Sequence, residues 1–289
     1  MRSRFAPSPT GFLHWGHAYS ACCAYAWAGN QPRSFVLRIE DIDRQRCRVA
    51  YVGALEEDLR WLGIDWHHAP WVQSQRLDDY QKALQRLQHA GVLYPCFCTR
   101  KQIVAEVTRS LHAPNGHHQG LPYPGTCRRL SASDRERRLV DGENHAWRLD
   151  VARALTLVAQ PLRFYECGTG WIDAMPEAQG DIVLARKDCM TSYALACVMD
   201  DAAQGIEIVV RGEDLKPMTH TQRLLQALLN LPTPRYAHHR LLTDDSGVRL
   251  AKSAGSKSLR AAREDGVKAG DVMAWCQRQM RAEPWFSYL

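Results

Sequence analysis

The segment Arg4-Phe-Ala-Pro-Ser-Pro-Thr-Gly-Phe-Leu-His-Trp-Gly-His17 is a loop, stiffened by proline and glycine, that ends in two histidines three residues apart. Residues 2–6 are strand-like, and the apolar, alanine-rich stretch 18–28 predicts a helix. A second strand-like stretch, 34–39, follows that helix. This order predicts a βαβ unit, and therefore a parallel sheet with the loop at its carboxyl edge.

The two histidines, His14 and His17, come where the predicted helix begins. The first N–H groups of a helix have no partner within it and lie at the positive end of its dipole, so they attract anions. Imidazole N–H groups can add hydrogen bonds where negative charge builds up on a phosphate. We therefore expect His14, Gly16 and His17 to bind the phosphates of a nucleotide. The alternative is a pair of surface or capping histidines, which share this spacing.

A second segment, Arg249-Leu-Ala-Lys-Ser253, lies near the other end of the chain and carries Lys252 on a stretch rich in Ser and Gly. Such a stretch is suited to closing over a triphosphate, although a lysine beside Ser and Gly is also typical of a solvated loop. In this order, the two segments resemble the ATP-handling signatures of the class I aminoacyl-tRNA synthetases. Trp15 and Ala251 depart from those signatures, which usually have a small or branched apolar residue and a serine there.

Several segments between these two resemble one branch of that class, the glutamyl-tRNA synthetase group. They are Val36–Asp43, Gly180–Asp188, Tyr193, Val198–Asp201 and Ile208–Asp214. The resemblance extends over residues 2–257 and implies an α/β fold. In that fold, the Rossmann-type parallel sheet of a class I synthetase is split by a zinc-stapled α+β insertion and followed by a short C-terminal helical segment.

The resemblance also implies an adenylating reaction in which no side chain is the nucleophile. The α-carboxylate of the amino acid attacks ATP and forms an acyl-adenylate, while the protein supplies placement and electrostatic stabilisation. His14 and His17 would serve the α-phosphate, and Lys252 the pyrophosphate that leaves. ATP is expected to bind together with Mg²⁺.

Charge complementarity and the resemblance together favour L-glutamate as the substrate. A guanidinium can grip a carboxylate with two parallel hydrogen bonds, and Arg4 and Arg211 match family positions that contact glutamate. Glu40 can accept from the α-ammonium group, and Tyr193 can add a hydroxyl. The expected glutamate-binding residues are Arg4, Phe5, Ala6, Pro7, Ser8, Glu40, Tyr193 and Arg211. The alternative is that the two arginines form structural ion pairs, for which the nearby carboxylates are Glu40, Asp41, Glu213 and Asp214.

The chain has ten cysteines, and in a leaderless chain of this length we expect reduced thiols or metal ligands. Cys96, Cys98 and Cys127 form two local groups on a loop-rich stretch. Three thiolates and one harder donor would make a closed tetrahedral zinc site with a structural role. The resemblance implies Tyr123 as the fourth ligand. The rival fourth ligands are His112, His117 and His118, and the remaining alternative is three unligated cysteines.

We expect the chain to be organised in four segments. These are the first half of the catalytic domain (1–93), an acceptor-type insertion with the zinc site (94–179), the second half of the catalytic domain (180–235), and a KMSKS-like loop with a short stem-contact segment (236–289). The remaining predicted strands are 145–151, 181–185 and 207–211, with the second half resuming at 181–185. The remaining predicted helices are 49–62, 78–91, 193–201, 219–229 and 270–281.

The composition limits the class of protein. Lys and Arg total 37 against 31 Asp and Glu, and the net charge of +6 is compatible with a polyanionic partner such as tRNA. The longest nearly apolar run, 19–29, is too short to span a bilayer, and no leader is evident. We therefore expect a cytoplasmic, monomeric protein without a membrane partner.

Length separates the subfamilies of this group. A full glutamyl-tRNA synthetase continues into helices that read the anticodon, whereas this chain ends at Leu289. Its length and zinc pattern resemble those of the glutamyl-queuosine tRNA(Asp) synthetases. That resemblance implies activation of glutamate without tRNA, followed by transfer to queuosine in the anticodon of tRNA(Asp). Two alternatives stay open, a minimal glutamyl-tRNA synthetase that charges the tRNA 3′ end and a non-catalytic tRNA-binding paralogue.

Overall fold

A computed structural model of the chain describes residues 1–99, 101–104, 123–158, 161–186, 189–243 and 257–289. Its helices are α1 (Trp15–Trp27), α2 (Val49–Trp61), α3 (Leu77–His89), α5 (Ala132–Val140), α6 (Val151–Thr156), α7 (Tyr193–Ala203), α8 (Lys216–Leu228), α9 (Leu259–Glu264) and α10 (Ala269–Met280). Its strands are β1 (Ser3–Phe5), β2 (Phe35–Ile39), β3 (Trp71–Val72), β4 (Leu93–Cys96), β5 (Ala146–Leu149), β6 (Arg163–Glu166), β7 (Gly170–Asp173), β8 (Val183–Ala185), β9 (Ile208–Gly212) and β10 (Arg235–His239).

Parallel strands in the order β3-β2-β1-β9-β10 form the centre of a large sheet. Ser3 of β1 pairs with Phe35 of β2 on one side and with Ile208 of β9 on the other. Every residue of β2 is buried, as expected of a parallel strand that is covered on both faces. The predicted βαβ unit, and with it the mainly parallel α/β architecture, is therefore confirmed.

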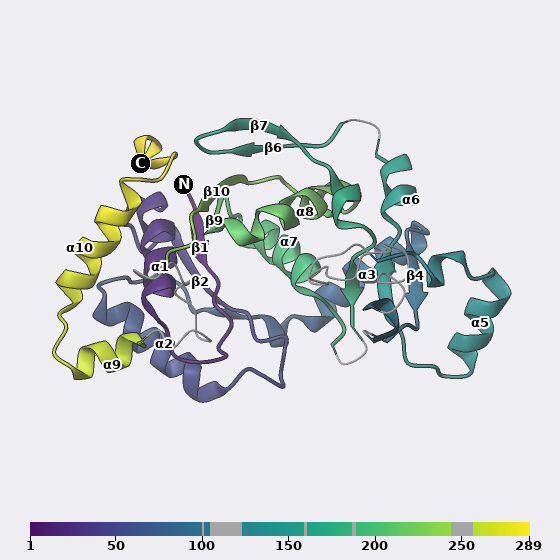
Figure 1. Cartoon of the computed structure of the whole chain (residues 1–289), viewed down its shortest axis with the longest axis horizontal. Coiled ribbons are helices and arrows are strands. Elements are labelled where there is room, and N and C mark those ends of the chain that lie inside the picture. The colour runs from purple at the N-terminus through teal and green to yellow at the C-terminus, as the bar shows by residue number, and fades with distance from the viewer. Residues whose placement is uncertain (100, 105–122, 159–160, 187–188, 244–256) are drawn as a thin grey trace.

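Helix α1 connects β1 to β2 and is buried around most of its circumference, because it packs between the sheet and the C-terminal helix α10 (Figure 1). Its side chains belong to the largest apolar cluster, which also contains Cys276 of α10 and Trp285 beyond it. The predicted helix at 270–281 is thus confirmed, with one boundary residue shifted at each end. It serves as the outer cover of α1.

The hairpin of β6 and β7 extends the large sheet beyond β10, so this part of the predicted insertion belongs to the central sheet. Tyr236 of β10 pairs with Glu166 of β6. At the hairpin turn, Gly168 has a φ of +86°, and a Cβ there would lie 2.8 Å from the backbone carbonyl carbon of Pro284. Glycine therefore lets the turn close against the C-terminal segment, as Figure 1 shows at the tip of the hairpin.

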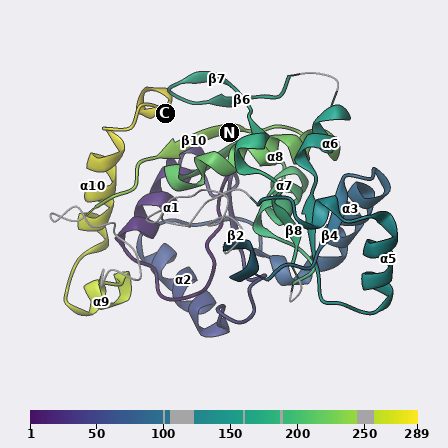
Figure 2. The same cartoon turned by 45° about the vertical axis from the view of Figure 1, so that its right-hand side comes forward.

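A separate three-stranded antiparallel sheet has the order β4-β5-β8 and lies beside α3 and α7 (Figure 2). We expected the second half of the catalytic domain to resume with a strand at 181–185. Instead, β8 pairs with β5, where Arg148 lies opposite Val183, and so belongs to the small sheet. The strand itself is thus confirmed, while its partner could not be predicted, because strand pairing is a long-range property and the local sequence specifies only an extended apolar segment.

Strand β10 was not predicted at all. Its residues, Arg235-Tyr-Ala-His-His239, lack the apolar run that marks a buried parallel strand, yet all but Arg235 are buried. Within the described ranges, the helices are too short or too polar for any of them to traverse a lipid bilayer.

Candidate active site

A cavity of about 600 Å³ lies at the carboxyl edge of the large sheet, beyond the ends of β1, β2 and β9. Apart from Lys252, which lies outside the described residues, every residue predicted to bind nucleotide or glutamate lines this cavity. These lining residues are Arg4, Phe5, Ala6, Pro7, Ser8, His14, Gly16, His17, Glu40, Tyr193 and Arg211. Residues widely separated in the sequence thus meet at one edge of the sheet.

The histidine pair caps helix α1. The Nδ1 atom of His14 accepts the N–H of Gly16 at 3.1 Å, and the Nδ1 atom of His17 accepts the N–H of His14 at 3.3 Å. The ring centroids are 3.9 Å apart. Because each Nδ1 is an acceptor, a neutral ring carries its proton on Nε2. Capping and phosphate binding are therefore compatible, since the two capping contacts use only the Nδ1 atoms and place the ring proton on Nε2.

A buried ionic network lies beneath the cavity. The carboxylate of Asp201, on α7, accepts from Nε of Arg4 at 3.1 Å and from Nη1 of Arg38 at 2.8 Å. Arg38 is completely buried and also donates to Glu40 at 3.2 Å. Burial alone would raise the pKa of Asp201, but the two guanidinium charges outweigh it and lower this pKa to about 2. Asp201 is therefore a carboxylate at any physiological pH.

The same network affects Arg4 and Glu40. Burial works against the charge of Arg4, but Asp201 more than offsets this effect, and the pKa of Arg4 is raised above its usual value. Burial raises the pKa of Glu40, although Arg38 and Arg4 pull it in the opposite direction. The charge of Arg4 is thus matched by a protein carboxylate.

Arg211, at the end of β9, has a different environment. Its guanidinium donates to the Tyr193 hydroxyl at 3.1 Å, to Oγ1 of Thr219 at 2.8 Å and to Nε2 of His238 at 3.1 Å. Among the described residues, no carboxylate forms an ion pair with it. Arg211 is only 4% exposed, so the cavity holds a buried cation in direct contact with neutral acceptors.

The alternative in which Arg4 and Arg211 form structural ion pairs applies, among the described residues, to Arg4 alone. Arg4 does form one, but its partner is Asp201, which was not among the candidates. Asp41 instead accepts from Ser74, through both its N–H and its hydroxyl.

Several residues of the site were missed in the sequence. Arg38 interrupts an otherwise apolar strand, and Asp200 and Asp201 follow each other within an apolar helix. Charged residues in such positions require buried partners, and this signal was available. For His238 and Glu166, which lie behind Arg211, no local signal exists.

Lys252 and the rest of Arg249–Ser253 lie outside the described residues. The chain on either side of them is described. Before them, Leu242 lines the cavity. After them, Ser258 forms an isolated antiparallel bridge with His14, and the N–H of Leu259 donates to the carbonyl of Leu13 at 2.8 Å. The flank after the lysine segment is thus attached to the loop that carries the histidines, and the flank before it lines the same cavity.

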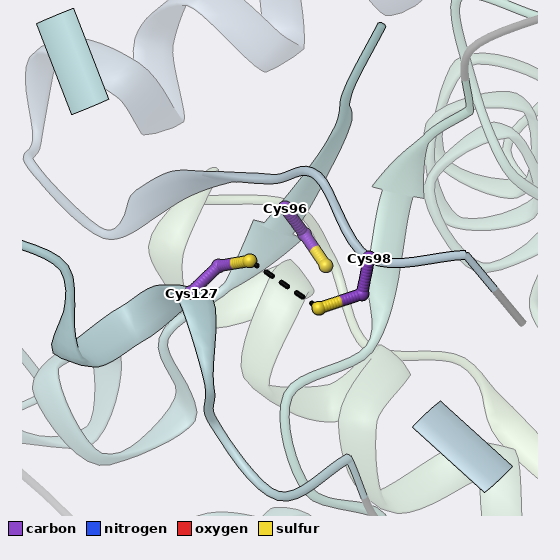
Figure 3. A group of neighbouring side chains, drawn as sticks. All are labelled: Cys96, Cys98 and Cys127. Atoms are coloured by element: carbon purple, nitrogen blue, oxygen red, sulfur yellow. Dashed lines mark hydrogen bonds between the residues drawn. The ribbon is translucent and has the colours of Figure 1, made fainter. Parts of the chain in front are cut away.

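The three singled-out cysteines meet at the end of β4, in a cluster with Tyr94, Phe97 and Tyr123 that we call the cysteine module. Their sulfur atoms point toward one another (Figure 3). The Sγ atoms of Cys96, Cys98 and Cys127 lie within 4.8 Å of one another, as in a group that could hold a metal ion. Sγ of Cys98 is 3.4 Å from that of Cys127. The donor set therefore fits a metal site.

The Tyr123 hydroxyl completes this group. It lies 3.4 Å from Sγ of Cys96 and 3.4 Å from Sγ of Cys98, and it accepts the N–H of Cys127 at 2.9 Å. Hydrogen bonding from Cys96 lowers the pKa of Cys127 to about 6. The candidate ligands His112, His117 and His118 lie outside the described residues, so Tyr123 is the described residue that offers a fourth donor.

Comparison with known families gives one match that covers most of the chain. The matching family is described as the catalytic domain of class I tRNA synthetases (E and Q), and the match spans residues 1–280. The match therefore covers the large sheet, the three-stranded sheet with the cysteine module, and α10.

Similar curated proteins include glutamyl-Q tRNA(Asp) synthetases and glutamate–tRNA ligases. A glutamyl-Q tRNA(Asp) synthetase from Rhodobacter capsulatus is 42% identical, and the match covers 94% of this chain and 98% of that protein. A glutamate–tRNA ligase from Aquifex aeolicus is 38% identical, with 92% of this chain and 54% of the relative covered. Among solved structures, a glutamate tRNA ligase from Elizabethkingia meningosepticum in complex with its amino acid has a TM-score of 0.70 at 25% identity, covering 91% of this chain and 53% of that one.

Proposed function

The chain belongs to the glutamyl-Q tRNA(Asp) synthetases, within the class I tRNA synthetase (E and Q) family, and we propose that it activates glutamate with ATP and transfers it to queuosine in tRNA(Asp). As a member of this family it is a ligase. The observation that carries the proposal is the cavity itself, in which the capping imidazoles and the buried cation of Arg211 lie together. One end suits a phosphate, and the other suits a carboxylate.

The charges of the cavity favour a dicarboxylic amino acid. Asp201 already matches the charge of Arg4, whereas Arg211 contacts only neutral acceptors among the described residues. The side-chain carboxylate of glutamate would supply the missing anion at Arg211, with Tyr193 as a further donor. Glu40 would accept from the α-ammonium group. Glutamine, which has no charge at that end, would leave the cation without a counter-charge.

The reaction then follows from placement. The α-carboxylate oxygen of glutamate bonds to the α-phosphorus of ATP. The bond between this phosphorus and the oxygen that bridges it to the β-phosphate breaks, and pyrophosphate leaves. The Nε2–H groups of His14 and His17 stabilise charge on the α-phosphate oxygens. Mg²⁺ bound together with the nucleotide would supply positive charge beside the leaving phosphates. A hydroxyl of queuosine next attacks the activated carbonyl, and the ester forms as AMP and the hydroxyl proton are released.

Lys252 completes this scheme as the partner of the pyrophosphate. Five residues separate it from Ser258, which is paired with His14, and an extended chain over these six Cα-to-Cα steps spans about 20 Å at most. A chain of this length would allow the lysine to reach a nucleotide bound at the histidines. Lys252→Ala is expected to lower the rate of glutamate-dependent ATP–pyrophosphate exchange about 10²- to 10³-fold, while the free energy of unfolding stays unchanged.

We also propose that Cys96, Cys98, Tyr123 and Cys127 hold a zinc ion. Four protein ligands close the tetrahedral shell, so the zinc would order the cysteine module and would take no part in the chemistry. The division of the chain into segments 1–93, 94–179, 180–235 and 236–289 is likewise a proposal, with β6, β7 and β8 placed as described above.

The test is transfer of labelled glutamate to tRNA(Asp) that contains or lacks queuosine. We expect pyrophosphate exchange without tRNA and a label that appears only on the queuosine-containing tRNA, within the anticodon. The similarity to glutamate–tRNA ligases favours a second candidate, a minimal enzyme that charges the 3′ end. A label on the terminal adenosine would support that candidate instead. Absence of glutamate-dependent exchange at saturating substrates would overturn both and favour a non-catalytic tRNA-binding protein.

A further inference from the structure

Arg211 is held from behind by a chain of two buried side chains that the proposed reaction does not use. Its Nε atom donates to Nε2 of His238 at 3.1 Å. Nδ1 of the His238 ring lies 2.8 Å from Oε2 of Glu166, and the backbone N–H of His238 donates to Oε1 of the same carboxylate at 3.0 Å. The three side chains come from β9, β10 and β6, which are neighbours in the large sheet.

This chain of contacts fixes the tautomer of His238. An arginine can only donate, so Nε2 of His238 must be the acceptor and carries no proton. The ring proton is therefore on Nδ1 and is donated to Glu166. In this state, the imidazole connects the carboxylate to the guanidinium through two hydrogen bonds, and it does not line the cavity.

Burial makes the arrangement specific. Glu166 is 3% exposed and His238 is 6% exposed, so neither finds an alternative partner in water. Neither residue lines the cavity, whereas Arg211 does. A carboxylate in direct contact with Arg211 would compete with a carboxylate ligand. Glu166 avoids that competition because the imidazole separates it from the guanidinium.

We propose that His238 and Glu166 are positioning residues, which fix the guanidinium of Arg211 with its remaining donors toward the glutamate side chain. This inference rests on the proposed function. It also gives the β6–β7 hairpin a role, because the hairpin brings Glu166 to the edge of β10. Selection for the acidic amino acid thus depends on a strand that precedes Arg211 by more than forty residues in the sequence.

The experiment measures pyrophosphate exchange as a function of glutamate and, separately, of ATP. In His238→Asn, the shorter side chain cannot bridge Arg211 and Glu166, and we expect KM for glutamate to rise about 10- to 100-fold. KM for ATP is expected to change less than about twofold, since the histidine pair is untouched. Glu166→Gln keeps the size of the side chain and an acceptor oxygen while losing the charge, so a smaller increase, about 3- to 10-fold, is expected.

Tyr236→Phe is the matched control. Tyr236 lies on the same strand, its ring is parallel to that of His238 at 5.9 Å, and its hydroxyl accepts from Gln226 at 3.0 Å. The substitution removes the buried hydrogen bond to Gln226 but keeps the aromatic ring, over which the Arg211 guanidinium lies 5.6 Å from the centroid, and leaves the three hydrogen bonds of Arg211 intact. We expect KM for glutamate in this variant to match that of the unsubstituted protein.

The outcomes separate the two proposals. If the unsubstituted protein supports no glutamate-dependent exchange, the proposed function fails and this inference fails with it. If exchange occurs but folded Glu166→Gln and His238→Asn both keep the original KM for glutamate, only the positioning role is overturned. An equal rise of both KM values, or a rise in Tyr236→Phe as large as in His238→Asn, would also overturn it, since either result indicates a general structural effect.

Discussion

The cavity of the large sheet and the cysteine module hold their polar groups in different ways. Beneath the cavity, Arg4, Arg38 and Asp201 are fixed by ion pairs within a sheet that large apolar clusters cover. The cysteine module has a far smaller cluster of its own, whose buried members are Tyr94, Cys96, Phe97, Tyr123 and Cys127. Three of these five are proposed metal ligands. The cavity is thus preorganised by packing, whereas the module depends on what its ligands bind.

Removal of the metal should expose this difference most strongly. Small zinc-binding peptides gain roughly 10–16 kcal/mol on binding and are unfolded without the ion. We expect chelation, or Cys98→Ser, to disorder the module while glutamate-dependent exchange falls only a few-fold. Hydrogen exchange resolved by segment, together with elemental analysis for zinc, measures both effects.

Cys47→Ser is the control for that experiment, because this thiol lies outside the cluster, and zinc content should stay at one ion per chain. Carefully purified protein that contains no zinc would contradict the proposed site. Global unfolding on chelation would contradict the contrast between the two regions.

Loss of Asp201 should destabilise the large sheet, which is the other of the two regions compared. Asp201→Asn leaves two buried guanidinium groups without their shared carboxylate, and removal of one partner from a buried ion pair costs about 3–5 kcal/mol. Chemical denaturation should show a loss of that size, spread over the whole large sheet. Glu56→Gln is the matched control, since its exposed pair with Arg60 contributes roughly 0.3–0.5 kcal/mol. A loss below 1 kcal/mol in Asp201→Asn would indicate that packing alone holds the site.

Acid provides a graded version of the same test. The pKa of Asp201 is lowered in the fold from 3.8 to about 2, so its contribution to stability is complete above pH 3.8 and is lost as the pH falls toward 2. The contribution amounts to about 2 kcal/mol. In denaturation series at pH 6, 4 and 2.5, the unsubstituted protein should lose most of this increment in the last interval. Asp201→Asn should lack it, and identical acid profiles for the two proteins would contradict the assignment.

The sequence was sufficient for features that depend on local pattern. The βαβ unit was predicted from the alternation of apolar runs with the Pro/Gly loop, and these elements are confirmed within one to three residues at each boundary. The cysteine group was also found in the sequence, because Cys96 and Cys98 lie two positions apart at the end of β4, and Tyr123 and Cys127 form a second local group about thirty residues later.

Pairing between distant strands could not be predicted in this way. Strand β10 carries His238 and His239 at buried positions, so its composition resembles a polar loop. Those histidines are tolerated only because Glu166 and Ser20, from other elements, provide hydrogen bonds. The same long-range pairing places the β6–β7 hairpin in the large sheet and β8 in the small one. The sequence therefore predicts the front of the cavity better than the residues behind it.

The smallest expected effect concerns the ring of Tyr123. The guanidinium of Arg148 lies over this ring, 3.9 Å from its centroid, and donates to the Asp181 carbonyl at 2.6 Å. A cation over an aromatic face contributes about 1 kcal/mol, so Arg148→Leu should weaken zinc retention about fivefold in competition with a chelator. Arg138→Leu is the comparison, because Arg138 lies 4.0 Å from the Phe97 ring centroid, and Phe97 offers no ligand. Equal zinc loss in both variants would mean that the arginines stabilise the module in general, and that packing on the Tyr123 ring does not orient the fourth donor.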